Sequence, residues 1–407
     1  MVGLIGFLLM WSASTSTTAD AIFVLGGLLL VVGAWSYPHA GDVTLHSHHL
    51  IAVLIAVVTV SRFIIPGGLT ALSWVRFTLP ISLVAILIAW LLVTRITPVW
   101  PRMVLVLVIA TVSGLLAFAR PPPPLDVYRI HIEAGRLIKE GQNPYSAMDL
   151  AQDLQRPEVR LSGYAYPPLT LIGYGIPSIV IDPRLVSTFW WVLLIGLLGH
   201  RATRDPYLFW LLIISVTSPL VVPMLLATFT EPYVAFLLVL GFEFYRRRPS
   251  TGRSLLLGLT IGSKQHVPTG LPGLWREMGW SNGWPVVAGA ALALGSGFLL
   301  SPFGYFRATM NNGLTADPFP LSASLYGLSG GRIDVSIWVA VAIALPVGWL
   351  VGRRRPTPTV LPLIASISII IGLAANAVWS HWVLVMILAL YHHIVRTKPD
   401  EPSRLEF

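Results

Sequence analysis

Apolar stretches long enough to cross a membrane recur along the whole 407-residue chain, and this feature restricts the fold more than any other. An α-helix satisfies its own backbone hydrogen bonds inside a bilayer, and ~20 residues of it cross the hydrocarbon core. Hydrophobic residues make up 55% of the chain and charged residues 11%, less than half of the ~25% found in a soluble domain. We therefore expect an all-α polytopic membrane protein of about 12–14 transmembrane helices, forming a single integral membrane domain over residues 1–407.

The predicted spans run from one end of the chain to the other. The segments near 254–275 are too short to cross singly, because Lys264-Gln265-His266 interrupts them and Pro and Gly residues follow at 268–272. We expect a broken or hairpin-like pair there. The spans cover about residues 2–12, 21–36, 49–65, 78–95, 102–120, 186–199, 207–226, 231–245, 254–264, 266–275, 284–301, 335–352, 360–375 and 379–395.

Arginine clusters orient these spans, since basic residues beside membrane segments tend to stay in the cytoplasm. The clusters are Arg246-Arg247-Arg248 with Arg253, Arg353-Arg354-Arg355, and the tail with Arg396 and Lys398. Counting back from them places two long loops, 121–185 and 302–334, on the extracytoplasmic face of the cell membrane, provided that residues 167–182 do not cross. Pro177 interrupts that segment, which is only about fifteen residues long, so we expect a helix resting on the outer face.

The first long loop begins with an amphipathic pattern. Apolar residues from Val127 to Ile138 recur at helical spacing with charged residues between them, which predicts a helix lying in the membrane interface. Gly141 and Asn143-Pro144 should end it. Asp126 stands at its start, where Asp is a preferred N-cap. Capping leaves one carboxylate oxygen free, so the same residue could also take part in catalysis at the membrane surface.

Other polar residues stand in apolar sequence near the predicted outer ends of spans. Glu231 begins one span, where a carboxylate is costly without a partner or a task. Lys264 and His266 flank the helix break and would suit an anion such as phosphate, or Lys264 could pair with a carboxylate such as Glu231. His381 lies at the start of the last span, and Arg332 lies in the second long loop with Arg307.

Several function classes are disfavoured by what the sequence lacks. It has no cysteine, so disulfides and thiolate chemistry are excluded. Its net charge of +9 comes from Arg and Lys beside membrane segments, which fits membrane anchoring and not nucleic-acid binding. There is no Gly-x-x-x-x-Gly-Lys-[Ser/Thr] loop and nothing that resembles a nucleotide-binding domain, which argues against an ATP-driven pump. The sequence also lacks an Asp-x-Asp pair for a nucleotide-sugar–metal site and a His-Glu-x-x-His motif.

Four short motifs follow one another between about residues 120 and 385. They are Asp126-x-Tyr128 with Gly141-Gln-Asn143-Pro144-Tyr145, Tyr166-Pro167-Pro168-Leu169, Lys264 ahead of Pro268 and Leu271-Pro272, and Trp379-Ser380-His381-Trp382. In this order they resemble the GT-C superfamily of integral membrane glycosyltransferases, and within it glycosyltransferase family 87, the polyprenyl-phosphate-mannose-dependent α-mannosyltransferases. The resemblance implies a GT-C fold.

The resemblance also implies an activity. A sugar, mannose in that family, would pass with inversion from a polyprenyl-phosphate donor to a glycolipid or glycan acceptor on the outer face. Asp126 would be the general base, and Lys264, His266 and His381 would stabilise the departing phosphate. A phosphate monoester is a reasonable leaving group, so neither a metal nor another cofactor is expected. Membrane lipids would surround the donor's tail.

The remaining candidate residues would bind substrate. The resemblance implies that Tyr128, Tyr145 and Tyr166 stack on sugar rings, although these tyrosines equally fit interfacial anchors. We place Glu231, Asn143 and Arg332 in the substrate-binding set as well.

Two other functions stay open at this stage. A secondary transporter or lipid flippase would place its charges near the bilayer midplane in paired halves, whereas the polar residues here gather at the predicted outer mouth. A polysaccharide polymerase or ligase would use Arg and His of the outer loops in place of an Asp base.

Overall fold

The computed structural model describes residues 99–121, 126–153, 156–218, 221–314, 335–352, 359–373 and 379–396. The spans predicted before residue 99 lie outside this part of the chain, as does Arg332.

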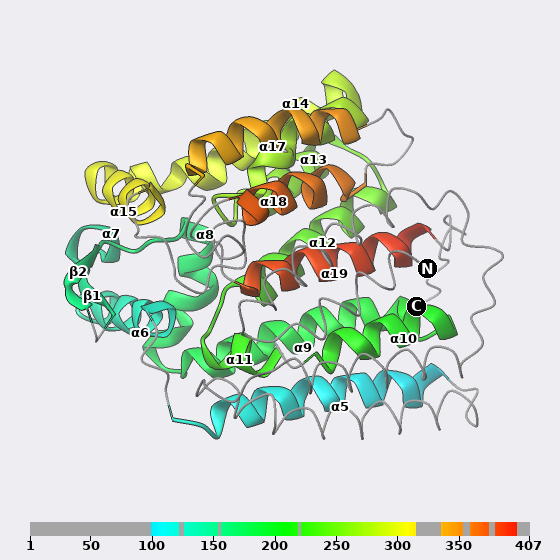
Figure 1. Cartoon of the computed structure of the whole chain (residues 1–407), viewed down its shortest axis with the longest axis horizontal. Coiled ribbons are helices and arrows are strands. Elements are labelled where there is room, and N and C mark those ends of the chain that lie inside the picture. Colours follow the sequence, from blue (N-terminus) through cyan, green and yellow to red (C-terminus); the bar gives the residue numbers. More distant parts are fainter. Residues whose placement is uncertain are drawn as a thin grey trace.

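Helices running roughly side by side form the body of the molecule (Figure 1). Within the described residues, three helical stretches are long and apolar enough to cross a membrane: Val99–Phe118, Pro183–Ala202 and Val267–Leu300. The mostly helical structure thus fits the expected α-helical membrane protein. The helices of the body are α5 (Val99–Phe118), α9 (Pro183–Ala202), α10 (Pro206–Val216), α11 (Val221–Leu226), α12 (Glu231–Arg247), α13 (Thr251–Ile261), α14 (Leu271–Leu300), α17 (Ile337–Val351), α18 (Leu361–Leu373) and α19 (Trp379–Arg396).

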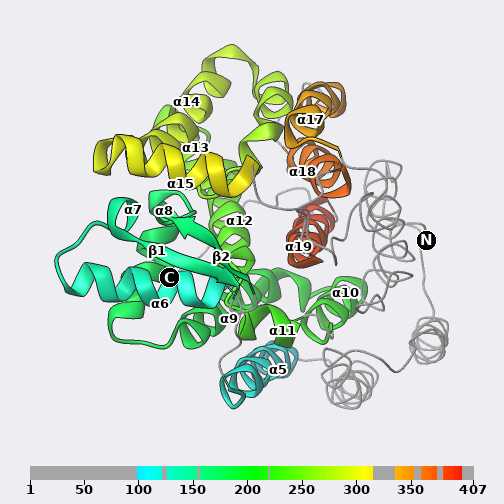
Figure 2. The same cartoon turned by 60° about the vertical axis from the view of Figure 1, so that its left-hand side comes forward.

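Smaller elements gather at one end of this body, on the left in Figure 1 and towards the viewer in Figure 2. We call it the loop end. Its elements are α6 (Asp126–Lys139), α7 (Pro144–Ala147), β1 (Asp149–Asp153), β2 (Arg156–Ser162), α8 (Pro168–Thr170), the π-helical turn η1 (Leu171–Gly175), the 3-10 turn η2 (Pro177–Ile179) and α15 (Pro302–Leu314).

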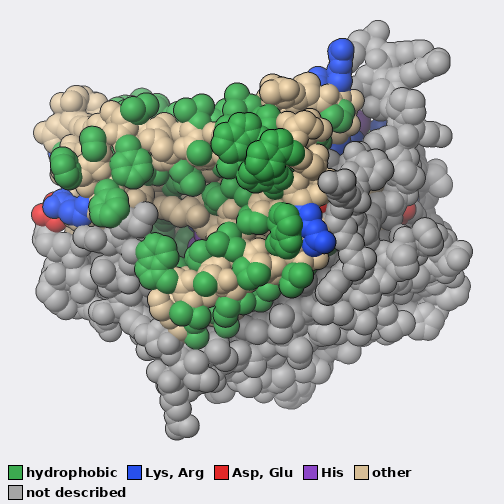
Figure 3. Space-filling view, turned by 90° about the horizontal axis from the view of Figure 1, so that it is seen from above, with side chains coloured by type: hydrophobic (Ala, Val, Ile, Leu, Met, Phe, Trp, Pro, Cys, Tyr) green, Lys and Arg blue, Asp and Glu red, His purple; other side chains and the backbone are tan. Residues whose placement is uncertain are grey.

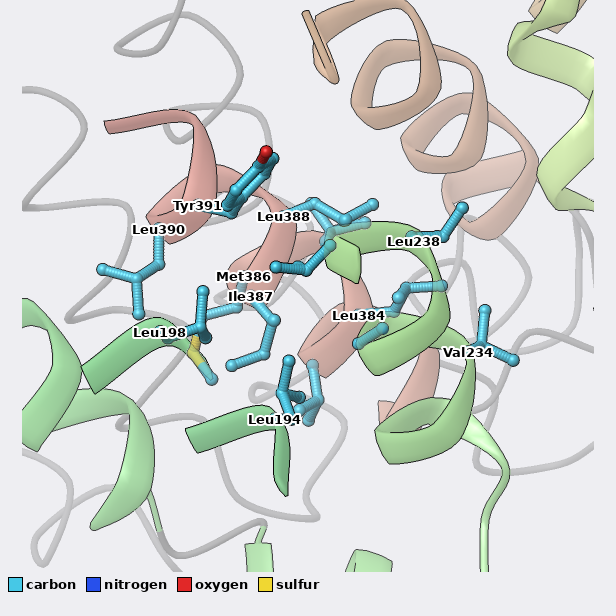
Figure 4. Packing of buried hydrophobic residues seen from close by; sticks show 14 of the residues in the cluster. Leu194, Leu198, Val234, Leu238, Leu384, Met386, Ile387, Leu388, Leu390 and Tyr391 are labelled. Atoms are coloured by element: carbon cyan, nitrogen blue, oxygen red, sulfur yellow. The ribbon is translucent and has the colours of Figure 1, made fainter. Parts of the chain in front are cut away.

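Buried apolar side chains fill the centre of the body. Helix α19 is buried without interruption from Val383 to Leu390, as expected for a helix surrounded by protein. Its side chains meet those of α9 and α12, including Leu194 and Leu238 (Figure 4). By contrast, α5 exposes Val104, Val108, Val112 and Leu115 at helical spacing. Such an exposed apolar stripe is what a lipid-facing helix presents.

Helix α6 forms where the amphipathic pattern predicted it, and it ends two residues before Gly141, whose φ of 72° favours glycine. Its apolar face packs against the protein, and its position in the membrane interface stays a prediction. Ile130, Ala134 and Leu137 are almost fully buried. The reason is that η1 and η2 cover this face, and a Cβ on Gly135 would come within 2.7 Å of the Ser178 backbone.

Residues 167–182 are not the single surface helix that we expected. The segment divides into α8, η1 and η2, because prolines at 167, 168 and 177 remove backbone donors. Leu171 and Tyr174 are buried, whereas Ile172 and Val180 are exposed.

The antiparallel pair β1–β2 is a second departure from the prediction, because only helices were expected. Its register pairs Asp149 with Ser162 and Leu150 with Leu161.

The expected broken pair near 254–275 is present. Helix α13 ends at Ile261, and the 3-10 turn η3 (Val267–Gly270) leads into α14. The spans predicted at 266–275 and 284–301 are joined in α14, which breaks at Gly279, with a φ of 72° and a ψ of 177°. Helices α13 and α14 approach each other closely because Gly258 has no side chain. A Cβ there would lie 2.0 Å from the Val286 carbonyl oxygen.

Candidate functional site

A buried carboxylate holds two basic groups together at the loop end. Glu231, the first residue of α12, is 1% exposed. Lys264 donates from Nζ to Glu231 Oε1 at 2.8 Å, and His381 Nδ1 hydrogen-bonds to the same oxygen. We call these three residues, with the neighbouring His266, the basic cluster. The structure thus shows the Lys264–Glu231 pairing that the sequence left open.

Local structure places each member. Glu231 lies in the first turn of a helix, where a negative charge is favourable, and Pro232 follows it at a position that proline tolerates. Lys264 lies in the turn between α13 and η3. That turn approaches α14 closely, since a Cβ on Gly262 would lie 2.8 Å from the Ala290 carbonyl oxygen. His381 lies in the first turn of α19.

His266 completes the cluster. Its ring centroid lies 5.0 Å from that of His381, with the ring planes tilted by 40°. Its Nε2 atom is buried and has no hydrogen-bond partner among the described residues. A buried polar nitrogen without a partner is costly, so this atom is suited to a ligand oxygen.

The cluster's charge balance follows from these contacts. Glu231 offsets the charge of Lys264, so any net positive charge of the cluster comes from protonation of His266 or His381. An ionised carboxylate only accepts, so the proton of the His381–Glu231 bond belongs to Nδ1 of His381. Nε2 of His381 is then the atom that can take up a further proton. With both rings neutral, the cluster carries little net charge and offers an anion its remaining hydrogen-bond donors.

The Tyr-Pro-Pro-Leu segment lies directly beside this cluster. Tyr145 Oη donates to the Tyr166 carbonyl oxygen at 2.9 Å, and Tyr233 Oη donates to the Leu169 carbonyl oxygen at 2.8 Å. One residue on, Thr170 Oγ1 donates to the Ser263 carbonyl oxygen at 2.8 Å. A further bond from Gln265 Nε2 reaches the Ala165 carbonyl oxygen. Two motifs about a hundred residues apart are thereby joined at the turn that carries Lys264.

The other predicted substrate-binding residues have structural contacts. Asn143 caps α7 through Oδ1 and donates from Nδ2 to the Leu300 carbonyl oxygen at 2.8 Å. Tyr145 is 0% exposed, so its ring offers no face to a sugar in this conformation. Tyr128 Oη donates to Asp182 Oδ2 at 3.3 Å, and Tyr166 is half-buried.

Asp126 is the first residue of α6, and its side chain lies outside what the structure describes. Its backbone position is one helical turn before the buried Ile130. Helix α6 and the basic cluster lie at the same end of the molecule (Figure 1). The contacts that join them were not indicated by the sequence.

The central contact of this kind is made by His131, which sequence reasoning missed. His131 is fully buried, and Tyr164 Oη lies 3.2 Å from its Nδ1. Burial lowers the pKa of His131 to about 3, so the ring is neutral. Its ring stacks on Tyr174, whose Oη donates to the Phe229 carbonyl oxygen, two residues before Glu231. A histidine among the apolar positions of α6 was the one signal in the sequence.

Within the described ranges, no three or more His, Asp or Glu side chains are grouped so that they could hold a metal ion. Comparison with known proteins gives no match to a family model, to a characterised protein or to a solved structure.

Proposed function

We propose that the chain is an integral membrane glycosyltransferase. It transfers a sugar, mannose by the motif resemblance, from a polyprenyl-phosphate donor to a glycolipid or glycan acceptor on the outer face of the membrane. The observation that carries this proposal is the basic cluster. Lys264 and His266, from the turn between α13 and η3, meet His381 of α19 beside the Tyr-Pro-Pro-Leu segment, at the end of the molecule where α6 begins with Asp126.

The proposed step is a single inverting displacement. The acceptor hydroxyl oxygen forms a bond to the anomeric carbon while the bond from that carbon to the phosphate oxygen breaks. Asp126 takes the acceptor's proton, and the polyprenyl phosphate leaves with the electron pair as an anion. The basic cluster stabilises the negative charge that develops on the phosphate.

The Glu231–Lys264 pair has a specific place in this proposal. A lysine already paired with a carboxylate is held in one position, so it contributes a fixed donor and little net charge. Protonation of His266 or His381 supplies the additional positive charge when the phosphate binds. The buried Nε2 of His266, which has no hydrogen-bond partner among the described residues, also supports a ligand that brings an oxygen to the cluster.

Activity of an Asp126→Asn variant tests the base. The purified protein in nanodiscs would receive polyprenyl-phosphate-mannose and a lipid acceptor, with product followed by mass spectrometry. We expect turnover to fall by about 100-fold or more, the usual contribution of a positioned general base. Asp149→Asn is the matched control, because Asp149 is exposed in β1 at the same end of the molecule, and it should keep normal turnover.

Three outcomes would contradict either the proposed reaction or the role of Asp126 as general base. Unchanged transfer by folded Asp126→Asn removes Asp126 as base. Retained transfer in that variant with loss in Arg307→Gln points instead to a polymerase or ligase. Movement of labelled substrate across a proteoliposome membrane without any covalent product points to a transporter or flippase.

The acceptor can be identified by comparing the glycolipids of cells with and without the chain. One missing hexose on one glycolipid would define both the reaction and the acceptor.

A further inference from the structure

Helix α15 leaves the body of the molecule at a sharp corner. α14 ends at Leu300, Ser301 is extended with a φ of −162°, and α15 begins at Pro302. In Figure 1, α14 runs along the body, whereas α15 is seen nearly end-on, so α15 lies crosswise to α14. Where a membrane-spanning helix is followed by a helix that lies crosswise to it, the second helix is expected to lie at the membrane surface.

One face of α15 is fixed to the loop end. Tyr305 and Ala308 are buried, and the Tyr305 ring meets the Tyr145 ring edge-on with centroids 5.2 Å apart. Gly304 makes this approach possible, because a Cβ there would lie 2.3 Å from the Tyr145 carbonyl oxygen. α15 is therefore held in place by the same tyrosine that bonds to the Tyr-Pro-Pro-Leu segment.

The opposite face of α15 is apolar and exposed. Phe303 is 91% exposed and Phe306 is 54% exposed. Leu299, at the end of α14, is 85% exposed and continues the same surface. The view in Figure 3 shows apolar side chains over much of the described surface on this side of the molecule. Large apolar groups exposed together in this way mark a surface that something apolar covers.

We propose that Leu299, Phe303 and Phe306 insert into the interfacial layer of the lipid bilayer, so that α15 is a membrane-surface anchor for the loop end. The occupant is lipid because the surface continues from α14, part of a stretch apolar enough to span a membrane. Arg307 is exposed beside Phe306 and can reach lipid headgroups. The proposal does not depend on the reaction, but it sets the height of the basic cluster relative to the membrane surface.

The absence of cysteine makes a direct test possible. Phe303→Cys would be labelled with an environment-sensitive nitrobenzoxadiazole probe, and the protein would be placed in phosphatidylcholine–phosphatidylglycerol liposomes. Arg136→Cys is the matched control, since Arg136 is exposed on the polar face of α6, also at the loop end. A second variant, Phe306→Cys, repeats the test where the first one folds poorly.

We expect probe emission at 303 to shift to shorter wavelength, to be quenched at least twofold by lipids with a nitroxide near the headgroup, and to be insensitive to iodide. The probe at 136 should show the reverse. Iodide quenching at 303 equal to that at 136 would overturn the proposal. So would a blue-shifted probe in detergent together with disulfide-linked dimers of Phe303→Cys, because a second copy of the chain would then cover this surface.

Discussion

His131 stacks on Tyr174, with ring centroids 4.6 Å apart and ring planes 19° apart. Tyr174 in turn donates from Oη to the Phe229 carbonyl oxygen, so this contact links the helix that begins at Asp126 to the segment that leads into Glu231. Thr228, in that segment, has a φ of 56°, a left-handed conformation that is uncommon for threonine. The surrounding contacts must hold this conformation, and the His131–Tyr174 pair is one of them.

Acid should weaken the protein through His131. Its pKa is about 3 in the folded protein, against 6.5 in an unfolded chain, because burial disfavours the charged ring. Below pH 6.5 the unfolded chain binds a proton at this histidine that the folded protein does not bind, so acid favours unfolding. The free energy of unfolding therefore falls as pH drops from 6.5 toward 3, by up to ~1.4 kcal/mol per pH unit, and is unaffected by His131 above pH 6.5. We expect the melting temperature in detergent to fall less between pH 7 and pH 5 in His131→Phe than in the wild type.

Ile132→Phe is the control for that measurement, since Ile132 is exposed on the same helix and carries no titratable group. Its melting temperature should follow the wild-type pH dependence. Identical pH dependence of wild type and His131→Phe would contradict the argument.

Glu231→Gln should destabilise the protein and impair donor binding. The substitution leaves Lys264 buried without its carboxylate, at a cost of about 3 kcal/mol. Combining it with Lys264→Met should destabilise less than the sum of the two single changes. Thermal unfolding of the four proteins measures this coupling, and strictly additive effects would show that the pair contributes nothing.

Glu243→Gln separates the loss of stability from the loss of binding. Glu243 is a second buried carboxylate on α12, paired with Arg201 at 2.7 Å and accepting from Tyr391 at 3.0 Å. Its loss should also lower the melting temperature. The Michaelis constant for the polyprenyl-phosphate donor should rise only in Glu231→Gln. A similar rise in both variants would mean that the effect is one of stability alone.

Sequence periodicity predicted those features that depend on neighbouring residues. The spacing of apolar residues from Val127 to Ile138 predicted α6, and the polar interruption at Lys264 predicted the break between α13 and η3. The position of Lys264 in apolar sequence also suggested that it pairs with a carboxylate, because a buried charge is costly in any fold.

Long-range pairing could not be predicted in the same way. His381 meets Glu231 across 150 residues, and only helix packing decides that contact. The burial of α6 against η1 and η2 also depends on packing, since an amphipathic pattern does not indicate which elements cover the apolar face. The motif resemblance suggests that Tyr145 contacts a sugar ring, but it does not predict the packing that buries this side chain.

Tyr233→Phe should disturb the site with little change in the fold. The hydroxyl of Tyr233 holds the Leu169 carbonyl oxygen, so its removal should cost about 1 kcal/mol. Because the bond positions the Tyr-Pro-Pro-Leu segment beside Lys264, turnover should fall severalfold. Tyr391→Phe removes a comparable buried hydroxyl on α19 and should keep its turnover. Equal turnover in the two variants would show that the segment needs no such support.

Gly279→Ala should destabilise the protein by about 1 kcal/mol or more. The φ of 72° at Gly279 is a left-handed conformation that a Cβ makes unfavourable, although no atom within 4 Å would clash with it. Gly295→Ala is the control within the same helix. It also has open space around its Cβ position, and as an ordinary helical position it should gain up to ~1 kcal/mol. Melting temperatures that move in opposite directions would establish that the chain turns at Gly279. A stabilising Gly279→Ala would instead require a continuous helix from 271 to 300, and the two spans predicted there would then be one.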